Sequence, residues 1–476
     1  MPDHGLENTP DKLDQCKVHI NMTSLDIAPD RHRCNFLERA LMRSCATLAL
    51  LAMLAAQLAS PAHAVLTIEI TKGKQGATPI AIVPFGFSGS SKAPREDLAA
   101  IVNADLARSG RFSPIATADL PSRPFELAQV DTADWRLLGT SHIVIGRMRV
   151  ITSGQYAVEF WLVDVFGGKH VAFGPLNTSA ANLRRTAHQI SDAVYERLTG
   201  ERGAFDTRIA YITETGRGDS RKYQLNVANS DGQGARTVVN SASPMMSPSW
   251  SPDGRQLTYV SFEAKRAEIY LQDVASGKRQ RLTHFPGLNG APAFSPDGRS
   301  MAMTLSKDGN PEIYIQDLRS NRLRRLTVNG AIDTEPSWSP DGRWIAFTSD
   351  RGGRPQIYRV SIDGSSRAER VTFEGAYNAR PRYSPDGSKL AMVHGNDGVF
   401  RIAVMDLENG AVSVVTDSYL DESPSFAPNG SMILYATSTR HGSSLAAVSA
   451  DGDVQQTLIE RRGSAREPAW SPYRNP

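Results

Sequence analysis

The sequence predicts a six-bladed, all-β propeller that follows a smaller α/β domain, and three observations predict it. A box with the pattern Ser-Pro-x-aromatic-Ser-Pro-Asp-Gly recurs, strand-like segments recur between its copies, and the two ends of the repeated region complement each other. A period of about 40–45 residues is the length of a four-stranded propeller blade. The first prolines of the six boxes are 44, 44, 45, 43 and 44 residues apart, at positions 248, 292, 336, 381, 424 and 468.

The box has the chemistry of a tight turn between two strands. In the Ser-Pro-Asp-Gly segment 339–342 the proline presets the backbone, the aspartate tolerates the third position, and the glycine can be left-handed. An apolar strand centred on Trp338 precedes this turn, and a second strand follows at 344–349. Each box is therefore predicted to be the hairpin between the first two strands of a blade. A third strand, such as 313–317, and a fourth, such as 325–327, complete each period.

The ends of the repeated region predict a closed ring. The segment 208–213 matches the second strand of later blades, but no box precedes it. The last box, at 467–472, has no second strand after it. We therefore expect 469–471 to be the innermost strand of the blade whose other strands lie near 207–240, so that five continuous blades and one shared blade make six. Sharing a blade between both ends leaves few exposed sheet edges.

Residues 1–64 are predicted to be a leader that ends in a signal peptide. Basic residues precede an apolar run over 46–59, and Ala62 and Ala64 form the small-residue pattern of a cleavage site after Ala64. The run is too short for a good membrane span. Met42 is an alternative start of the chain, and the sequence leaves that choice open.

Charge and cysteine content narrow the classes of function. A net charge of +3 over 476 residues is too small to argue for a nucleic-acid-binding surface. All three cysteines, Cys16, Cys34 and Cys45, lie before the predicted cleavage. The exported part would therefore have no thiol for a disulfide, a metal site or nucleophilic catalysis, and no cofactor is predicted.

Residues 65–203 are predicted to form the α/β domain, and residues 204–476 the propeller. Apolar spacing predicts helices at 95–109, 131–139 and 183–198. Strands are expected at 65–70, 80–85, 142–150, 156–163 and 170–173. No glycine-rich phosphate loop lies between a strand and a helix in this segment.

The loops that lead into the first strand of each blade are predicted to form a polar ring around the channel mouth. The Ser-Pro-Asp-Gly turns all fall on one rim, so these loops fall on the opposite rim. A polar ring can hydrogen-bond a protruding partner, although strand capping and solvation explain such residues more simply. The predicted partner-binding residues of the ring are Asn289, Asp333, Thr334, Glu335, Asn378, Arg380, Asp421, Glu422, Arg466 and Glu467.

Over residues 65–476 the chain resembles the TolB family of the Tol-Pal system. The resemblance rests on the combination of signal peptide, α/β segment and six boxes with three further segments. These are Ile-Val-Pro-Phe at 82–85, Leu-Thr-Gly at 198–200 before Ala-Phe-Asp-Thr-Arg-Ile-Ala-Tyr at 204–211, and Asn-Gly-Ala-Pro-Ala-Phe-Ser at 289–295. The polar leader 1–41 departs from the family pattern.

The resemblance implies a non-enzymatic periplasmic adaptor that supports outer-membrane integrity and envelope constriction at cell division. A Pal-type lipoprotein would bind the propeller, which favours a binding role for the polar ring as a whole. A TolA-type inner-membrane protein would engage the mature N-terminus, at Val65, Leu66, Thr67, Ile68, Glu69 and Ile70. We expect this strand either to pack on the body of the protein or to pair with a partner, with the first partner biasing the choice.

An exported propeller enzyme, such as a glycosidase, is the alternative. Glu335 and Asp421 at the channel mouth are the carboxylates that would do acid–base chemistry. The Gly-x-Ser-x-Gly motif of a hydrolase domain is not found in the sequence. His284, His394 and His441 lack the spacing typical of metal ligands.

Overall fold

The computed structural model describes residues 66–72, 76–89, 92–439, 442–460 and 463–474. The predicted signal peptide with its cleavage residues Ala62 and Ala64, and the predicted first mature residue Val65, lie outside this part of the chain. In the part that is described, no helix is both long enough and apolar enough to cross a membrane.

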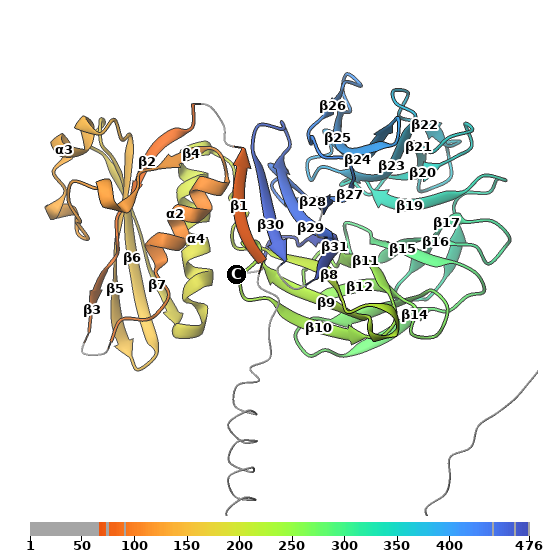
Figure 1. Ribbon diagram of the computed structural model, residues 1–476, viewed down its shortest axis with the longest axis horizontal. Helices are drawn as coiled ribbons and strands as arrows, with labels where there is room; N and C mark the ends of the chain where they lie inside the picture. Colours follow the sequence, from red (N-terminus) through yellow and green to blue (C-terminus); the bar gives the residue numbers. More distant parts are fainter. Residues whose placement is uncertain (1–65, 73–75, 90–91, 440–441, 461–462, 475–476) are drawn as a thin grey trace, which may run out of the picture. The chain divides into compact units, whose positions relative to one another are not determined.

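The α/β domain is a mixed sheet in the order β4-β2-β5-β6-β7, with β3 paired to β5 (Figure 1). Its strands are β2 (Thr78–Ile82), β3 (Gly86–Ser88), β4 (Phe112–Pro114), β5 (His142–Thr152), β6 (Gln155–Asp164) and β7 (His170–Ser179). Its α-helices are α2 (Leu98–Arg108), α3 (Thr132–Leu137) and α4 (Leu183–Thr199), close to the helices predicted from apolar spacing. Asp97 caps α2 by accepting a hydrogen bond from the backbone of Ala100 (3.1 Å).

Successive side chains along β2 belong to two different hydrophobic clusters, one on each face of the sheet. Ile80 and Ile82 are buried in one cluster with α2 and α4. Ala81 and Val83 are buried in another with Trp135 of α3. Because neighbouring side chains of a strand point to opposite faces, α2 and α4 cover one face and α3 covers the other.

Six four-stranded blades follow, and the predicted six-bladed propeller is confirmed. Blade 1 contains β31 (Ser464–Trp470), β8 (Arg208–Thr215), β9 (Lys222–Asn229) and β10 (Arg236–Ser241). Blade 2 contains β11 (Met245–Trp250), β12 (Gln256–Ser261), β13 (Glu268–Asp273) and β14 (Arg279–Thr283). Blade 3 contains β15 (Asn289–Phe294), β16 (Ser300–Leu305), β17 (Glu312–Asp317) and β18 (Leu323–Arg325).

Blade 4 contains β19 (Asp333–Trp338), β20 (Trp344–Ser349), β21 (Gln356–Ser361) and β22 (Glu369–Arg370). Blade 5 contains β23 (Tyr377–Tyr383), β24 (Lys389–Asn396), β25 (Val399–Asp406) and β26 (Val412–Val414). Blade 6 contains β27 (Asp421–Phe426), β28 (Met432–Thr439), β29 (Gly442–Ser449) and β30 (Gln455–Glu460). The first strand of every blade faces the axis, so the six boxes surround one channel.

The last strand of the chain closes the ring, as the two incomplete ends predicted. β31 pairs antiparallel with β8, with Ala469 opposite Ala210. The indole of Trp470 donates to the hydroxyl of Thr207 (2.9 Å), and the backbone of Arg208 donates to the hydroxyl of Ser471 (2.9 Å). Backbone pairing and side-chain hydrogen bonds therefore both join the end of the chain to the start of the propeller.

A fifth strand, β1 (Leu66–Lys72), lies on the outer edge of blade 6. It pairs antiparallel with β30, with Leu66 opposite Glu460 and Ile70 opposite Gln456 (Figure 1). The predicted strand at the mature N-terminus thus exists, but it extends the propeller sheet, while the sheet of the α/β domain begins at Thr78.

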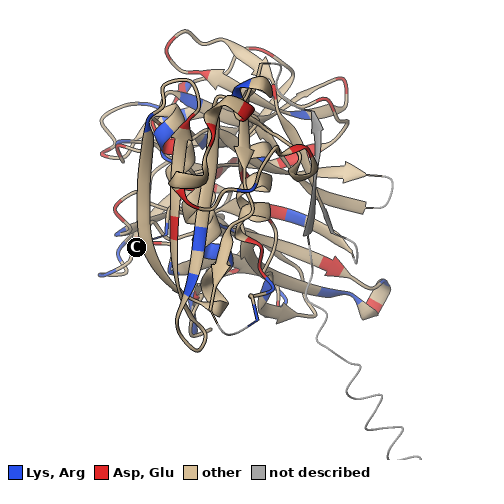
Figure 2. Ribbon diagram, turned by 90° about the vertical axis from the view of Figure 1, so that its left-hand side faces the viewer, with Lys and Arg blue, Asp and Glu red and all other residues tan. Residues whose placement is uncertain are grey.

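Charged residues of both signs are interspersed over the ribbon in Figure 2, without a field of one sign. This distribution agrees with the small net charge of +3. A single-signed surface that would attract a nucleic acid by its charge is not seen in this view.

The glycine of each complete box is left-handed, as the turn chemistry predicts. In the box of blade 4 the amide of Gly342 donates to the carbonyl of Ser339 (2.9 Å), and φ of Gly342 is 70°. Each such glycine also lies against the proline of the preceding box, which links the turns around the rim. These pairs are Pro252 with Gly298, Pro296 with Gly342, Pro340 with Gly387, Pro385 with Gly430 and, from the last box to the first, Pro472 with Gly254.

We predict that Gly342→Val lowers the free energy of unfolding by about 1–2 kcal/mol, because a side chain is strained at this positive φ. A Cβ atom at this position would meet Pro296 only at an ordinary 3.9 Å, so the loss would come from the backbone. Gly330→Val is the matched control. A Cβ atom added at Gly330 would meet no atom within 4 Å, and φ of Gly330 is not positive. Equal denaturant midpoints for the two variants would contradict the assigned turn.

Candidate functional site

The two rims of the propeller carry different structures. Strand 1 of each blade runs from the loop that enters the blade to the Ser-Pro-Asp-Gly turn, and antiparallel order returns strand 2 to the first side. We call the rim of entering loops and strand 2–3 hairpins the partner rim, and the rim of Ser-Pro-Asp-Gly turns the turn rim. The box of blade 6 has Asn429 where aspartate is usual, and its amide donates to the carbonyl of Arg202 (3.1 Å). This contact ties the turn rim to the segment that follows α4.

Each first strand has the same irregularity beside the channel. The residue before the first box proline has a positive φ in all six blades, and the strand register shifts there. These residues are Ser247 (53°), Ala291 (47°), Glu335 (59°), Arg380 (54°), Ser423 (58°) and Glu467 (51°). A left-handed conformation is strained for residues other than glycine, and such strain gathers at functional positions. We call these six residues the inner ring.

Arg380 crosses the channel within the inner ring. Its guanidinium pairs with Glu335 (Nε to Oε1, 3.0 Å) and with Glu467 (Nη1 to Oε1, 3.0 Å), and it also donates to Ser423. Burial alone would lower the pKa of Arg380, but Glu467 and Glu335 more than offset burial and raise it. The backbone of Ser247 donates to Glu467 (3.1 Å), so the network joins five of the six blades.

Four of the predicted partner-binding residues are buried where the entering loops meet the first strands. Asn289, Asp333, Asn378 and Asp421 are fully buried, and they occupy equivalent places at the start of four first strands. The amide of Asn289 donates to the carbonyl of Phe285 (2.8 Å), and Asp333 accepts from Arg351 (2.6 Å). The amide of Asn378 donates to the carbonyl of Glu374 (2.7 Å), whereas neither carboxylate oxygen of Asp421 has a hydrogen-bond partner among the described residues. Three of the four side chains are therefore hydrogen-bonded within the protein.

The other six predicted residues lie nearer the channel. Glu335, Arg380 and Glu467 belong to the inner ring, and Thr334, Glu422 and Arg466 are half-buried in the first strands. Arg466 pairs with Glu214 of the neighbouring strand (Nη2 to Oε2, 3.4 Å). Glu335 and Asp421, considered for acid–base chemistry, are not a free pair: Glu335 holds Arg380, and Asp421 is fully buried.

Exposed apolar side chains gather on the partner rim, and the sequence analysis missed them. Val328, Phe373 and Tyr419 lie in three successive entering loops and are 74%, 73% and 69% exposed. Further exposed apolar residues in these loops and in the strand starts are Met246, Leu288, Ile332 and Leu420. We call these seven residues the rim apolar set. The sequence does contain a pattern that could have indicated part of this set. Leu288, Ile332 and Leu420 each precede the first box proline of their blade by four residues.

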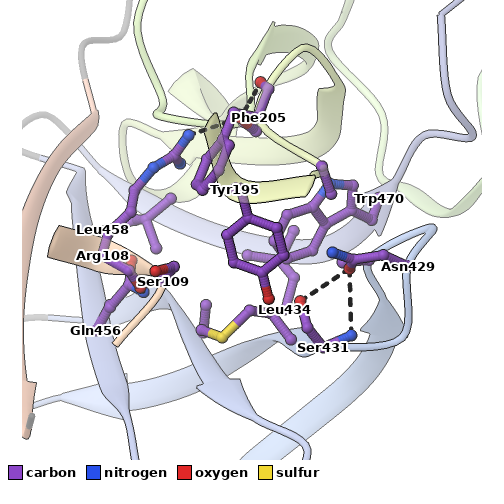
Figure 3. A pocket seen from close by; sticks show the side chains of 15 residues that line it. Arg108, Ser109, Tyr195, Phe205, Asn429, Ser431, Leu434, Gln456, Leu458 and Trp470 are labelled. Atoms are coloured by element: carbon purple, nitrogen blue, oxygen red, sulfur yellow. Dashed lines mark hydrogen bonds between the residues drawn. The ribbon is translucent and has the colours of Figure 1, made fainter. Parts of the chain in front are cut away.

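A small cavity of about 40 Å³ lies between the α/β domain and blade 6, and Figure 3 shows the side chains that line it. Gln456 and Leu458 of β30 line this cavity together with Arg108, Tyr195 and Phe205. The amide of Gln456 donates to the carbonyl of Arg108 at the end of α2. The α/β domain thus supports the strand on which β1 is paired.

Buried charges join α2 and α4 to blade 1. His188 of α4 contacts Asp105 (Nδ1 to Oδ2, 2.7 Å) and Asp231 of the propeller (Nε2 to Oδ2, 3.4 Å). Arg108 pairs with Asp105 (2.9 Å), and Arg184 pairs with Asp231 (2.5 Å). Burial alone would lower the pKa of His188, but the two carboxylates offset burial and raise it to about 9. Within the described part of the chain, no three His, Cys, Asp or Glu side chains are grouped to hold a metal ion.

A ring of six blades closed by its own ends and joined to an α/β domain defines a two-domain β-propeller protein. Two family models match it: the TolB amino-terminal domain over residues 66–171 and the TolB beta propeller domain over residues 195–474. The chain belongs to the TolB family.

Solved and curated relatives agree along most of the chain. A Tol-Pal system protein TolB from Thioalkalivibrio sulfidiphilus is 58% identical over 87% of this chain and 95% of that protein. One from Nitrosococcus oceani is 57% identical over 90% of this chain and 98% of that protein. The crystal structure of TolB from Acinetobacter baumannii covers 86% of this chain and 100% of that chain, with a TM-score of 0.79 and 42% identity.

The raised pKa of His188 predicts a pH dependence of stability. The stabilisation is fully present below the unfolded pKa of about 6.5 and is lost as the pH rises to about 9. The shift corresponds to a few kcal/mol, on the order of 3. Thermal unfolding of the protein and of His188→Gln between pH 6 and pH 9.5 measures it. The advantage of the protein over the variant should shrink across this range, and a constant difference would contradict the charged His188.

Proposed function

We propose that this protein is a non-enzymatic adaptor of the Tol-Pal system in the periplasm. It binds a Pal-type lipoprotein through the partner rim and a TolA-type inner-membrane protein through the mature N-terminus. In this role it supports outer-membrane integrity and envelope constriction at cell division. The names of its relatives, Tol-Pal system protein TolB, support membership of that system.

The rim apolar set is the observation that carries the docking proposal. Seven large apolar side chains are exposed in the loops and strand starts of one rim. Soluble proteins rarely expose neighbouring apolar side chains without a partner to cover them. Aromatic residues such as Phe373 and Tyr419 bury large areas at interfaces and dominate binding energies.

The inner ring gives this surface a rigid polar centre. Arg380 is fixed by two carboxylates and Ser423. Buried hydrogen bonds of Asn289, Asp333 and Asn378 hold three of the entering loops. A preorganised surface loses less entropy on association than a mobile one. We therefore assign the predicted polar residues to shaping the rim, and the rim apolar set to contacting the lipoprotein.

The strand β1 suits a second partner because it is an edge strand. It pairs with β30 along one side only, so its other edge has no strand partner among the described residues. An edge strand can add a strand of another chain or leave its sheet to pair elsewhere. The TolA-type protein would use one of these routes.

The partner rim and β1 meet at the end of blade 6. Leu66 pairs with Glu460 at the end of β30, and the chain then enters β31 at Ser464. The hydroxyl of Ser464 accepts from the backbone of Ser443 in the β28–β29 hairpin (3.2 Å). A lipoprotein on the partner rim therefore lies next to the segment where the pairing of β1 begins.

Phe373→Ser should weaken binding of a Pal-type lipoprotein by about 2 kcal/mol, roughly thirtyfold, because an exposed aromatic anchor is lost. Phe166→Ser is the matched control, since Phe166 is 60% exposed in the β6–β7 turn of the α/β domain. Calorimetric titration with the lipoprotein measures both variants. Equal affinities of the two variants would place the interface elsewhere.

The affinity for a TolA-type protein should change when the lipoprotein is bound, because both act on the end of blade 6. Thermodynamic linkage requires the same factor in the reverse order of addition. A chain that lacks residues 66–72 is the control, and its lipoprotein affinity should not respond to the TolA-type protein. Identical affinities with and without the first partner would remove the coupling while leaving the docking proposal intact.

A further inference from the structure

A chamber of the channel extends from the inner ring, at Ser247 and Ala291, towards the turn rim. Its volume is about 310 Å³, many times the roughly 10–15 Å³ that one water needs. The residue after the first box proline lines it in every blade, and we call these six the outer ring. They are Ser249, Ala293, Ser337, Arg382, Ser425 and Ala469. The chamber extends to Pro252, Pro296 and Pro472 of the turn rim.

Among the described residues, Arg382 is the one charged side chain that lines this chamber. Its guanidinium donates to the carbonyl of Pro381 (2.8 Å), and no carboxylate among the described residues pairs with it. Burial lowers the pKa of Arg382, and the more distant Glu335 and Glu467 do not make up for burial. Those two carboxylates are already paired with Arg380. One positive charge of the channel wall is thus left without a paired carboxylate among the described residues.

The rest of the outer ring supplies hydroxyl groups that can donate, and no carboxylate. The hydroxyl oxygen of Ser425 accepts the amide of Trp470 (2.9 Å), which leaves its hydrogen without an acceptor among the described residues. The side chain of Ser249 has no hydrogen-bond partner among them. The carbonyls of Ala293 and Ala469 already accept the indoles of Trp338 and Trp250 (3.0 and 3.1 Å).

An arginine with free donors beside serine hydroxyls matches a small oxyanion. The planar guanidinium binds two oxygens of a carboxylate or phosphate at once, and charge-assisted hydrogen bonds are the strongest of their kind. A buried charge without an opposite charge is costly. The attraction between Arg382 and an anion is therefore stronger in this chamber than in bulk water. Carboxylates line the inner ring and none lines this chamber, so the attraction to an anion is not opposed at contact distance.

We propose that the turn-side chamber of the channel binds one small oxyanion, a carboxylate or a phosphate, on the guanidinium of Arg382. The anion enters from the turn rim, because the ion pairs of Arg380 cross the channel on the other side. The site is separate from the partner rim, so its presence or absence leaves the proposed adaptor function unchanged.

The test is calorimetric titration of the purified protein in chloride-free buffer with sodium phosphate and, separately, with sodium acetate. Saturable binding of one anion per chain is expected, weakened at least about tenfold in Arg382→Ser. Serine matches three other members of the outer ring. Arg343→Ser is the control, since Arg343 is exposed beside the turn of blade 4 and should leave binding unchanged. Binding of phosphate alone or acetate alone identifies which oxyanion the site takes.

Thermal unfolding gives a second readout. Arg382→Ser without added anion should unfold no lower than the protein, because an unpaired charge is removed, and phosphate should raise its midpoint less than that of Arg343→Ser. Arg382→Lys keeps the charge but not the fork, and should bind phosphate more weakly than the protein. The proposal is overturned if no anion binds saturably, or if Arg382→Ser and Arg343→Ser respond alike.

Discussion

The pairing of β31 with β8 is the contact on which the rest of the structure depends. It joins strands from both ends of the propeller segment into blade 1. It also places the box of β31 beside the channel, as in the other five blades. Glu467 of that box then reaches Arg380, and the inner ring closes. Without this strand the partner rim would have a gap, and the edge of β8 would be left open to other chains.

The channel shows how one repeated backbone conformation can present side chains of different chemistry. The bulge before the box proline repeats in all six blades, while the side chain placed there changes from serine and alanine to glutamate and arginine. The repeated backbone conformation determines the position of the side chain, and the residue type determines whether that side chain is apolar, polar or charged. Arg380 stands before the proline and is neutralised, whereas Arg382, two residues on, faces a chamber with no carboxylate. The strand β23 therefore supplies Arg380, whose ion pairs cross the channel, and Arg382, whose charge has no paired carboxylate on the turn side.

Much of the fold could be predicted from the sequence, because it rests on local chemistry. The period of the boxes, the Ser-Pro-Asp-Gly turns and the complementary ends predicted six blades and their closure. The pairing of β1 with β30 was not predicted, because it joins residues almost 400 positions apart and depends on which sheet edge is free. The ten polar residues predicted to bind a partner include fully buried residues at the loop bases as well as half-buried residues nearer the channel. A polar residue such as Asp333 looks the same in the sequence whether it faces solvent or holds its own loop.

Amide hydrogen exchange tests the central claim, that the partner rim of the closed ring is a protein-docking surface connected to β1. The protein is compared alone and saturated with a Pal-type lipoprotein. Protection is expected in the entering loops around Val328, Phe373 and Tyr419, together with a changed exchange rate in residues 66–72. Protection confined to the turn rim or to the α/β domain, with unchanged entering loops, would contradict the account.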